Sequence, residues 1–175
     1  FVFMPTIDSD WVTIAIEMPQ GTTVDQTRRV VSHIERAAMD VRDRLDAERG
    51  VADADASIYR NVFSLIGDQP MGARSRFTPT GSGGGQAHLA EIVIELLPSE
   101  ERTVSSSSIV AHIRAAAGDL SGPESVTYTA SLFTIGNAIE IQLASADFEQ
   151  LLVAVERLKD EIASYPGTSE IQDSF

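Results

Sequence analysis

Four short segments of the chain alternate apolar and polar residues, which is the period of a β-strand with one buried face. In the first segment, WVTIAIEM, every even-numbered position is apolar. Runs of the same kind, separated by turn residues or by longer stretches, follow further along the chain. The predicted strands lie at residues 11–18, about 54–66, 88–97 and 125–133.

Two longer stretches between these segments repeat apolar residues every three or four positions, which is the period of an amphipathic helix. The first begins after Thr23, which can form a capping box with Gln26, and continues to Gly50. The second begins in the serine run at 105–108 and ends before Gly122. The predicted order of elements is β-α-β-β-α-β, the ferredoxin-like pattern of the α+β class.

The pattern then starts again in the last part of the chain. AIEIQLA at 138–144 predicts a strand, Asp147 caps a helix that runs to Ile162, and a short strand is expected at 169–173. A lone β-α-β unit cannot cover its own sheet, so we expect this region to be half of a second ferredoxin-like domain. The predicted parts are a leading segment at 1–10, a first domain at 11–134 and the partial β-α-β at 135–175.

Both helices of a ferredoxin-like domain cover one face of the sheet, so alternation assigns each strand residue either to the core or to an open face. The predicted core residues are Val12, Ile14, Ile16, Ile58, Val62, Ile66, Ala90, Ile92, Ile94, Leu96, Val126, Tyr128, Ala130 and Leu132. The predicted open-face residues are Trp11, Thr13, Ala15, Tyr59, Phe63, Leu65, Glu91, Val93, Glu95, Thr127, Thr129 and Phe133. An uncovered face with aromatic residues either packs on a neighbouring domain or forms a binding cleft, and the pattern leaves both interpretations open.

Composition narrows the classes of partner. The chain has 175 residues, with 13 Lys and Arg against 26 Asp and Glu, for a net charge of −13. A surface this acidic repels phosphate backbones, so we expect no nucleic-acid partner. There is no cysteine, which excludes disulfides and thiolate chemistry. No apolar run approaches the ~18 residues of a membrane-spanning helix, and because FVFMP opens the chain without an initiator methionine, we expect a piece of a longer protein.

No set of residues predicts a catalytic or metal site. The glycine-rich stretch at 72–86 lies between two strands, whereas a phosphate-binding loop lies between a strand and a helix. The three histidines fall in separate elements without acidic residues at ligand spacing, and the serine run has no partner histidine or nucleophile elbow. The EER sequence at 100–102 is interpreted as a solvated turn. We therefore expect no enzyme activity, no metal and no cofactor.

Three motifs in order resemble one known family. They are FMPTIDSDWVTIAIEMPQGTTVDQTRRVVSHIE, then IELLPSEER with a serine-started helix containing HIR, then IEIQLASADFEQLLVAVERLKDEIASYPGTSEIQDS. Together they resemble the second periplasmic loop of resistance-nodulation-division (RND) efflux pumps of the acriflavine-resistance type. The likeness runs along nearly the whole chain.

The resemblance implies the periplasmic porter region of the C-terminal half of a proton-driven antiporter. Residues 1–8 would then be the exit from the membrane, and the two predicted domains would be successive porter subdomains. Such pumps are inner-membrane trimers that export drugs or other amphiphiles together with a periplasmic adaptor and an outer-membrane channel. Because their proton-relay residues lie in transmembrane helices, this part is expected to bind substrate and gate its passage, without pumping by itself.

The resemblance also implies site residues, in a cleft with a glycine-bearing switch loop. It places Phe63 on a pocket aromatic, Gly67 at the start of the loop, and Val93 where the family often has phenylalanine. The expected cleft residues are Tyr59, Phe63, Leu65, Gly67, Phe77, Val93 and Phe133. The expected switch-loop residues are Gly72, Arg74, Arg76, Gly81, Gly83, Gly84 and Gly85.

Some features depart from the family pattern and leave alternatives open. The loop between Gly67 and Gln86 is longer than expected and has Phe77 as its sole aromatic residue, so it is either the switch loop or a plain connector. Because the methionines form no evident thioether cluster, the heavy-metal branch of the family is disfavoured. RND relatives that carry lipids or metal ions, and a free-standing ferredoxin-like module that senses a ligand and regulates a partner protein, are the alternative functions.

Overall fold

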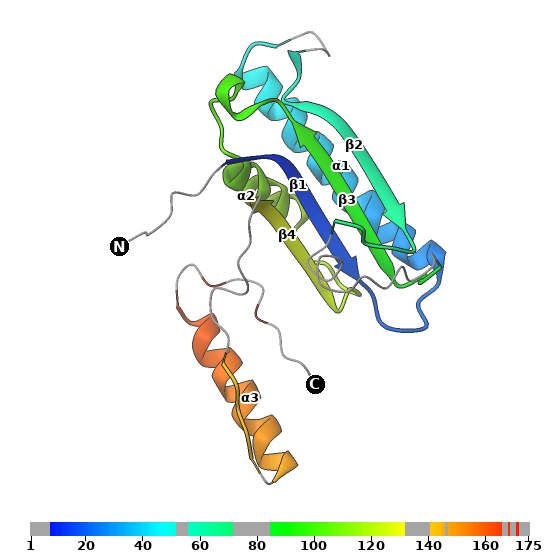
Figure 1. Cartoon of the computed structure of the whole chain (residues 1–175), viewed down its shortest axis with the longest axis vertical. Coiled ribbons are helices and arrows are strands. Elements are labelled where there is room, and N and C mark those ends of the chain that lie inside the picture. The colour runs from blue at the N-terminus through cyan, green and yellow to red at the C-terminus, as the bar shows by residue number, and fades with distance from the viewer. Residues whose placement is uncertain are drawn as a thin grey trace. The chain divides into compact units, whose positions relative to one another are not determined.

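A computed structural model of the chain describes residues 8–51, 56–71, 85–131, 141–145, 147–165, 168 and 171. The chain divides into two compact units, Phe1–Phe133 and Thr134–Phe175. Unit 1 holds all the described strands (Figure 1). Its elements are β1 (Asp8–Glu17), α1 (Val24–Glu48), β2 (Tyr59–Ile66), β3 (Leu89–Leu96), the short 3-10 helix η2 (Ser99–Glu101), α2 (Ser106–Ala117) and β4 (Ser125–Ser131).

The four strands of unit 1 form one antiparallel sheet in the order β2-β3-β1-β4. Strands β1 and β3 therefore occupy the centre, and β2 and β4 are the edges (Figure 1). The chain order β-α-β-β-α-β and this strand order are those of the ferredoxin-like arrangement. The predicted α+β fold class is confirmed.

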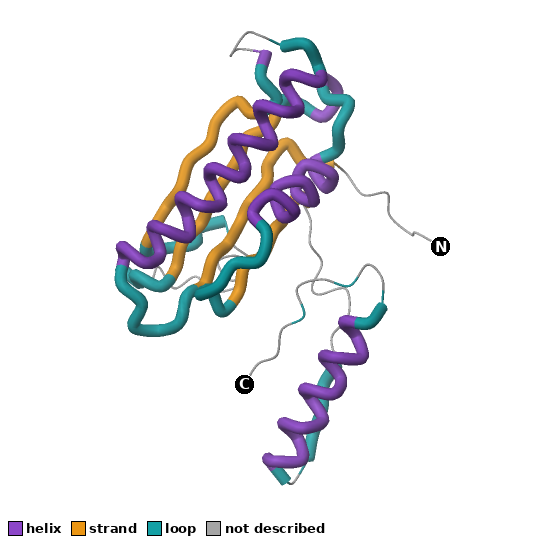
Figure 2. The backbone as a smooth tube through the Cα atoms, turned by 180° about the vertical axis from the view of Figure 1, so that it is seen from behind, coloured by secondary structure: helices purple, strands orange, loops and turns teal. Residues whose placement is uncertain are grey.

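Helices α1 and α2 lie across the same face of the sheet, as Figure 2 shows from behind. The predicted capping box begins α1, with the Thr23 N–H donating to Oε1 of Gln26 at 3.0 Å and the Gln26 N–H donating to Oγ1 of Thr23 at 3.4 Å. Ser105 caps α2, because its Oγ accepts the N–H of Ser108 at 3.2 Å. Both helix starts lie where the sequence predicts them.

The core lies between the helices and the sheet. Ile14 of β1 and Ile92 and Ile94 of β3 are fully buried there, against Ile34 of α1 and Ile113 of α2. Branched aliphatic side chains suit this position, because they pack well on a pleated surface and lose little freedom at χ1. The described members of the predicted core set are all in this cluster or packed against it.

The assignment of Tyr59 to the open face was wrong. Tyr59 pairs with Leu96 while Asn61 pairs with Glu95, so β2 contains one extra residue, a bulge, at this point. The bulge shifts the alternation by one position and turns Tyr59 into the core, where it is 5% exposed. Burial raises the pKa of the Tyr59 phenol, and the charge of Asp46 adds to this while Arg42 opposes it.

The predicted start of the first strand was wrong, because β1 begins at Asp8 rather than at Trp11. Residues 8–10 are therefore part of the strand at the start of unit 1.

Unit 2 contains the helix α3 (Phe148–Ala163), at the position that the sequence predicts. Its N-cap is Asp147, whose Oδ1 accepts the N–H groups of Glu149 at 3.0 Å and Gln150 at 3.2 Å. The described part of the predicted strand 138–144, residues 141–144, is not a strand. The described part of unit 2 contains no strand with which residues 141–144 could pair. A strand without a partner would leave its backbone N–H and C=O groups unpaired.

Candidate functional site

The face of the sheet opposite the helices is the first candidate site, and we call it the open face. Three rows of paired residues cross it. They are Asn61–Glu95–Trp11, Phe63–Val93–Thr13–Thr129 and Leu65–Glu91–Ala15–Thr127. Phe63 is 47% exposed, Leu65 is 41% exposed and Trp11 is 36% exposed. Large apolar side chains are therefore presented to solvent on one side of the domain.

The structure brings three of the expected cleft residues together on the open face. Phe63 and Val93 are direct partners across β2 and β3, and Leu65 follows two positions along β2. Val93 itself is fully buried, whereas Phe63 and Leu65 on the edge strand are not. Phe63 and Leu65 can therefore contact a ligand, whereas Val93 presents no surface to one.

Gly67 lies at the end of β2 and closes the base of the long loop. Its N–H donates to the carbonyl of Leu89 at 2.8 Å, and its own carbonyl accepts the N–H groups of Gly85 at 3.3 Å and Gln86 at 3.2 Å. Its backbone φ angle is +109°, a value that residues other than glycine rarely adopt. The two ends of the loop are thus held together at the rim of the open face, as the switch-loop and connector interpretations both allow.

The other loop and cleft residues proposed from the sequence lie outside the described residues. They are Gly72, Arg74, Arg76, Phe77, Gly81, Gly83, Gly84 and Phe133.

Two residues just after Gly67 reach back over the sheet, and the sequence did not point to them. The side-chain amide of Gln69 donates to the carbonyls of Ile16 at 2.8 Å and Ala90 at 3.1 Å, so it bridges β1 and β3. The N–H of Met71 donates to Oε2 of Glu91 at 3.0 Å, and Glu91 is 1% exposed. Glutamine after a turn glycine carries no distinctive signal, so only the fold reveals these contacts.

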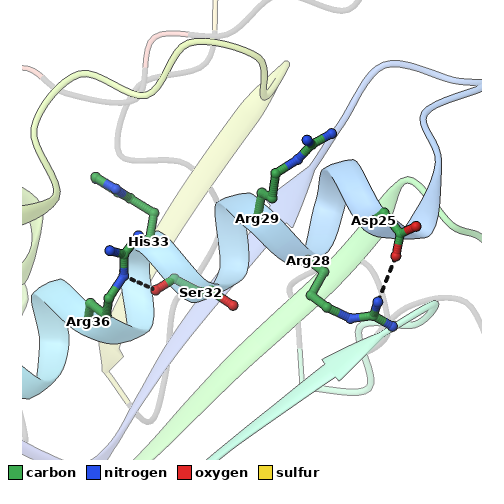
Figure 3. A pocket seen from close by; sticks show the side chains of 6 residues that line it. All are labelled: Asp25, Arg28, Arg29, Ser32, His33 and Arg36. Carbon is green, nitrogen blue, oxygen red and sulfur yellow. Dashed lines mark hydrogen bonds and ion pairs between the residues drawn. The ribbon is translucent and has the colours of Figure 1, made fainter.

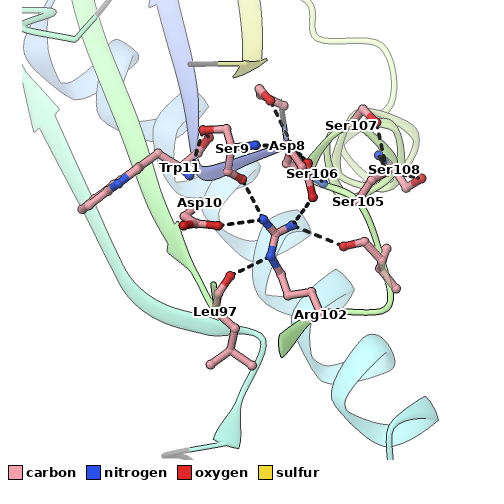
Figure 4. Close-up of polar contacts among 12 residues, drawn as sticks. Asp8, Ser9, Asp10, Trp11, Leu97, Arg102, Ser105, Ser106, Ser107 and Ser108 are labelled. Atoms are coloured by element: carbon pink, nitrogen blue, oxygen red, sulfur yellow. Dashed lines mark hydrogen bonds and ion pairs between the residues drawn. The ribbon is translucent and has the colours of Figure 1, made fainter. Parts of the chain in front are cut away.

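A buried arginine cluster at the other end of β1 is the second candidate site (Figure 4). The side chain of Arg102 has no exposed surface, and its Nε donates to the carbonyl of Leu97 at 2.6 Å. Its terminal nitrogens reach the carbonyls of Val104 at 3.2 Å and Ser9 at 2.8 Å. The same terminal nitrogens also contact two carboxylates, Oδ2 of Asp8 at 3.1 Å and Oδ1 of Asp10 at 3.0 Å.

The Arg102 guanidinium thus makes four hydrogen bonds and an ion pair with Asp8, and each of its three nitrogens has a partner within the protein. The cluster ties the start of β1 to the segment between β3 and α2, so its role is structural. The interpretation of residues 100–102 as a solvated turn was therefore wrong for Arg102, although Glu100 and Glu101 are exposed. An isolated arginine after two glutamates gives no sign of burial in the sequence.

Asp8 joins this cluster to the N-terminus of α2. Its Oδ1 accepts the N–H of Ser106 at 2.9 Å and also the Ser106 hydroxyl. Partial burial by itself raises the pKa of Asp8, but the hydrogen bonds from Ser106 and Ser9 and the charge of Arg102 outweigh it. The pKa of Asp8 is therefore held below its ordinary value.

The described residues contain no group of three or more histidine or acidic side chains placed to hold a metal ion. His33 instead bonds through Nε2 to the carbonyl of Ala117 at 2.9 Å, which links α1 to the end of α2. Of the helices in the described ranges, none combines the length and apolarity needed to cross a membrane.

No known protein family model matches the chain, and no curated protein sequence is significantly similar to it.

Proposed function

We propose that this chain is the periplasmic porter region of an RND-type exporter and that its open face forms one wall of a binding site for small amphiphiles. The observation that carries the proposal is the exposure of Phe63, Leu65 and Trp11 around the buried Val93 on a sheet face that neither helix of unit 1 covers. The order of motifs along the chain and the ferredoxin-like fold support the same assignment.

In this proposal the domain binds and gates and does no chemistry of its own. The apolar tail of an amphiphile lies along Phe63 and Leu65, and the two ends of the long loop, held together at Gly67, lie at the rim of the site. The proton-driven transport, the trimer, the adaptor and the outer-membrane channel belong to the intact pump. A wall of this kind suits varied substrates, because apolar contact does not depend on the direction of hydrogen bonds.

Binding by the purified chain tests the proposed face directly. Trp11 is the chain's single tryptophan and lies on the open face, so its fluorescence reports on that face. We expect a neutral fluorescent probe such as N-phenyl-1-naphthylamine to bind and to quench Trp11, and we expect Phe63→Ala to weaken binding. Phe148→Ala is the matched control, since Phe148 is 59% exposed but belongs to unit 2. Equal binding by all three proteins would contradict the proposed face.

A second experiment separates an exporter from a ligand sensor. The complete gene that encodes this chain is expressed in a bacterial strain that lacks its own efflux pumps, and resistance to a panel of amphiphiles is measured. An exporter raises resistance, and Phe63→Ala changes the pattern across the panel at unchanged expression. If the complete protein raises resistance to none of them, the transport assignment fails, whatever the purified chain binds.

A further inference from the structure

The outer surface of α1 carries a row of basic residues that the proposed function does not use. Arg28, Arg29, His33 and Arg36 lie within nine consecutive positions and, with Asp25 and Ser32, line a shallow depression of about 550 Å³ (Figure 3). We call this surface the basic row. It stands out because the whole chain has a net charge of −13.

Two members of the basic row, Arg29 and Arg36, form no ion pair with the described residues. Arg28 is paired with Asp25 at 2.7 Å, and Arg36 donates its Nε to the backbone carbonyl of Ser32 at 3.1 Å. Among the described residues, no carboxylate lies within ion-pair distance of Arg29 or Arg36. The nearby acid Glu35 accepts a hydrogen bond from the Ser64 hydroxyl at 2.5 Å, which turns it towards β2.

The second half of the same helix is different. There Arg42 contacts Asp43 at 2.7 Å and Arg49 contacts Asp46 at 3.3 Å, so basic and acidic side chains compensate each other locally. Arg44 also has no carboxylate within ion-pair distance among the described residues, but residues 37–48 carry four acidic residues against two arginines, whereas residues 24–36 carry three arginines against two acidic residues. The excess of positive charge on α1 therefore lies in its first half.

The shape of the basic row indicates an extended partner. Arg28 and Arg29 point to opposite sides of the helix in Figure 3, so their guanidinium groups do not converge on a single small anion. Arg29 and Arg36 are seven residues apart, about 10 Å along the helix axis. Several carboxylates spaced along a second helix or strand can meet both of them.

The net charge distinguishes between the possible polyanions. A nucleic acid or an anionic membrane presents charge over an area much wider than the basic row, and the Debye length of about 8 Å lets the rest of this acidic chain oppose its approach. A short acidic segment of a protein contacts the basic row alone. The same repulsion disfavours a second copy of this chain.

We propose that the basic row is a docking surface for an acidic segment of a partner protein. It lies on the helical side of the domain, so this contact is independent of amphiphile binding at the open face.

The probe for this proposal is a fluorescein-labelled helical peptide with glutamates along one face and alanines elsewhere. Binding to the full 175-residue chain is followed by fluorescence anisotropy at low and moderate salt. We expect Arg29→Gln with Arg36→Gln to weaken binding by about tenfold, because each exposed ion pair contributes modestly. The matched control is Arg42→Gln with Arg44→Gln, which removes the same charge from the same helix and is expected to bind like the unaltered chain.

Charge reversal provides a second variant. The chain with Arg29→Glu and Arg36→Glu should lose the acidic peptide and gain binding to the same peptide with lysine in place of glutamate. These arginines are on the surface of α1, so circular dichroism is expected to show an unchanged fold.

Several outcomes overturn the proposal. The proposal is wrong if the peptide does not bind at low salt. It is also wrong if both double variants weaken binding equally, because that result indicates general electrostatic attraction. If inorganic phosphate displaces the peptide at constant ionic strength, the basic row is a site for a small anion. If vesicles of phosphatidylglycerol and phosphatidylcholine bind more tightly than the peptide, and this binding requires Arg29 and Arg36, the partner is a membrane. If sedimentation shows a dimer that these substitutions abolish, the partner is a second copy of the chain.

Discussion

The two faces of the unit 1 sheet are built from the same four strands but differ in what covers them. Ile14, Ile92 and Ile94 on the helical face are fully buried, whereas Phe63 on the open face is 47% exposed. Yet Val93 and Glu91, also on the open face, are 0% and 1% exposed. Exposure on the open face thus does not follow hydrophobicity. Strand position does not explain it either, because Trp11 on the central strand β1 is 36% exposed. What lies over each residue matters, since Glu91 accepts the N–H of Met71 from the segment that folds back over the sheet.

The helical face therefore holds the aliphatic core on which folding depends, while the exposed side chains of the open face, Phe63, Leu65 and Trp11, are available for binding. Burial of aliphatic side chains is the dominant favourable contribution to folding. An exposed aromatic contributes little to stability and is available to a partner or ligand. Substitutions on the two faces are therefore expected to separate stability from binding.

The largest expected effect is on the helical face. Ile14→Ala should lower the free energy of unfolding by about 2 to 5 kcal/mol, because it removes buried methyl groups and leaves a cavity. Phe63→Ala should cost less than about 1 kcal/mol, because the ring is already half in solvent. Urea unfolding followed by circular dichroism gives both values. Similar losses for both substitutions would show that the open face is part of the folding core.

A smaller effect is expected at the Asp8 and Arg102 cluster, at one end of the sheet. Because the folded-state pKa of Asp8 is below its unfolded value, its contribution to stability is fully present above about pH 4 and is lost as the pH falls through the folded-state pKa. Asp8→Asn should cost about 1 kcal/mol at neutral pH and should reduce the loss of stability on acidification.

The measurement is urea unfolding across the acidic range, with Asp25→Asn as the control. Asp25 also contacts an arginine, but the side chain is 82% exposed, so its substitution should change little. If Asp8→Asn leaves the pH dependence of the free energy of unfolding unchanged, the Asp8 and Arg102 cluster does not contribute to acid stability as proposed.

The smallest expected effect has the opposite sign. The Tyr59 hydroxyl is buried and has no hydrogen-bond partner within the described part of the chain, which costs free energy in the folded state. Tyr59→Phe removes that cost and keeps the ring in the core, so it should stabilise the domain by up to about 1 kcal/mol. Thermal unfolding of the two proteins measures this. A destabilised Tyr59→Phe protein would mean that the hydroxyl is satisfied.

Much of the fold was predictable because local signals agree with one another. The capping box at Thr23 and the serine cap before α2 fixed two helix starts, and the alternation in β1 and β3 identified the core face. These signals are local, since they depend on residues within about one turn or on the strand period of two. They were also sufficient to assign Phe63 and Val93 to the same face of the sheet, whereas their direct pairing is seen only in the structure.

The errors came from contacts between residues distant in the chain. The bulge in β2, which moves Tyr59 into the core, exists only in its pairing with β3. Arg102 is buried because the start of β1 and the loop before α2 both supply acceptors to it. Neither arrangement has a local pattern.

By itself, the sequence determined the α+β class, the order of elements in unit 1, the helix caps and, apart from Tyr59, the division of the described strands into two faces, because periodicity and capping act over a few residues. The tertiary structure alone decided that Gln69 and Met71 fold back over the sheet and that Glu91 is buried beside them. It also decided which arginines of α1 lack a carboxylate partner among the described residues, because pairing depends on where side chains meet in space.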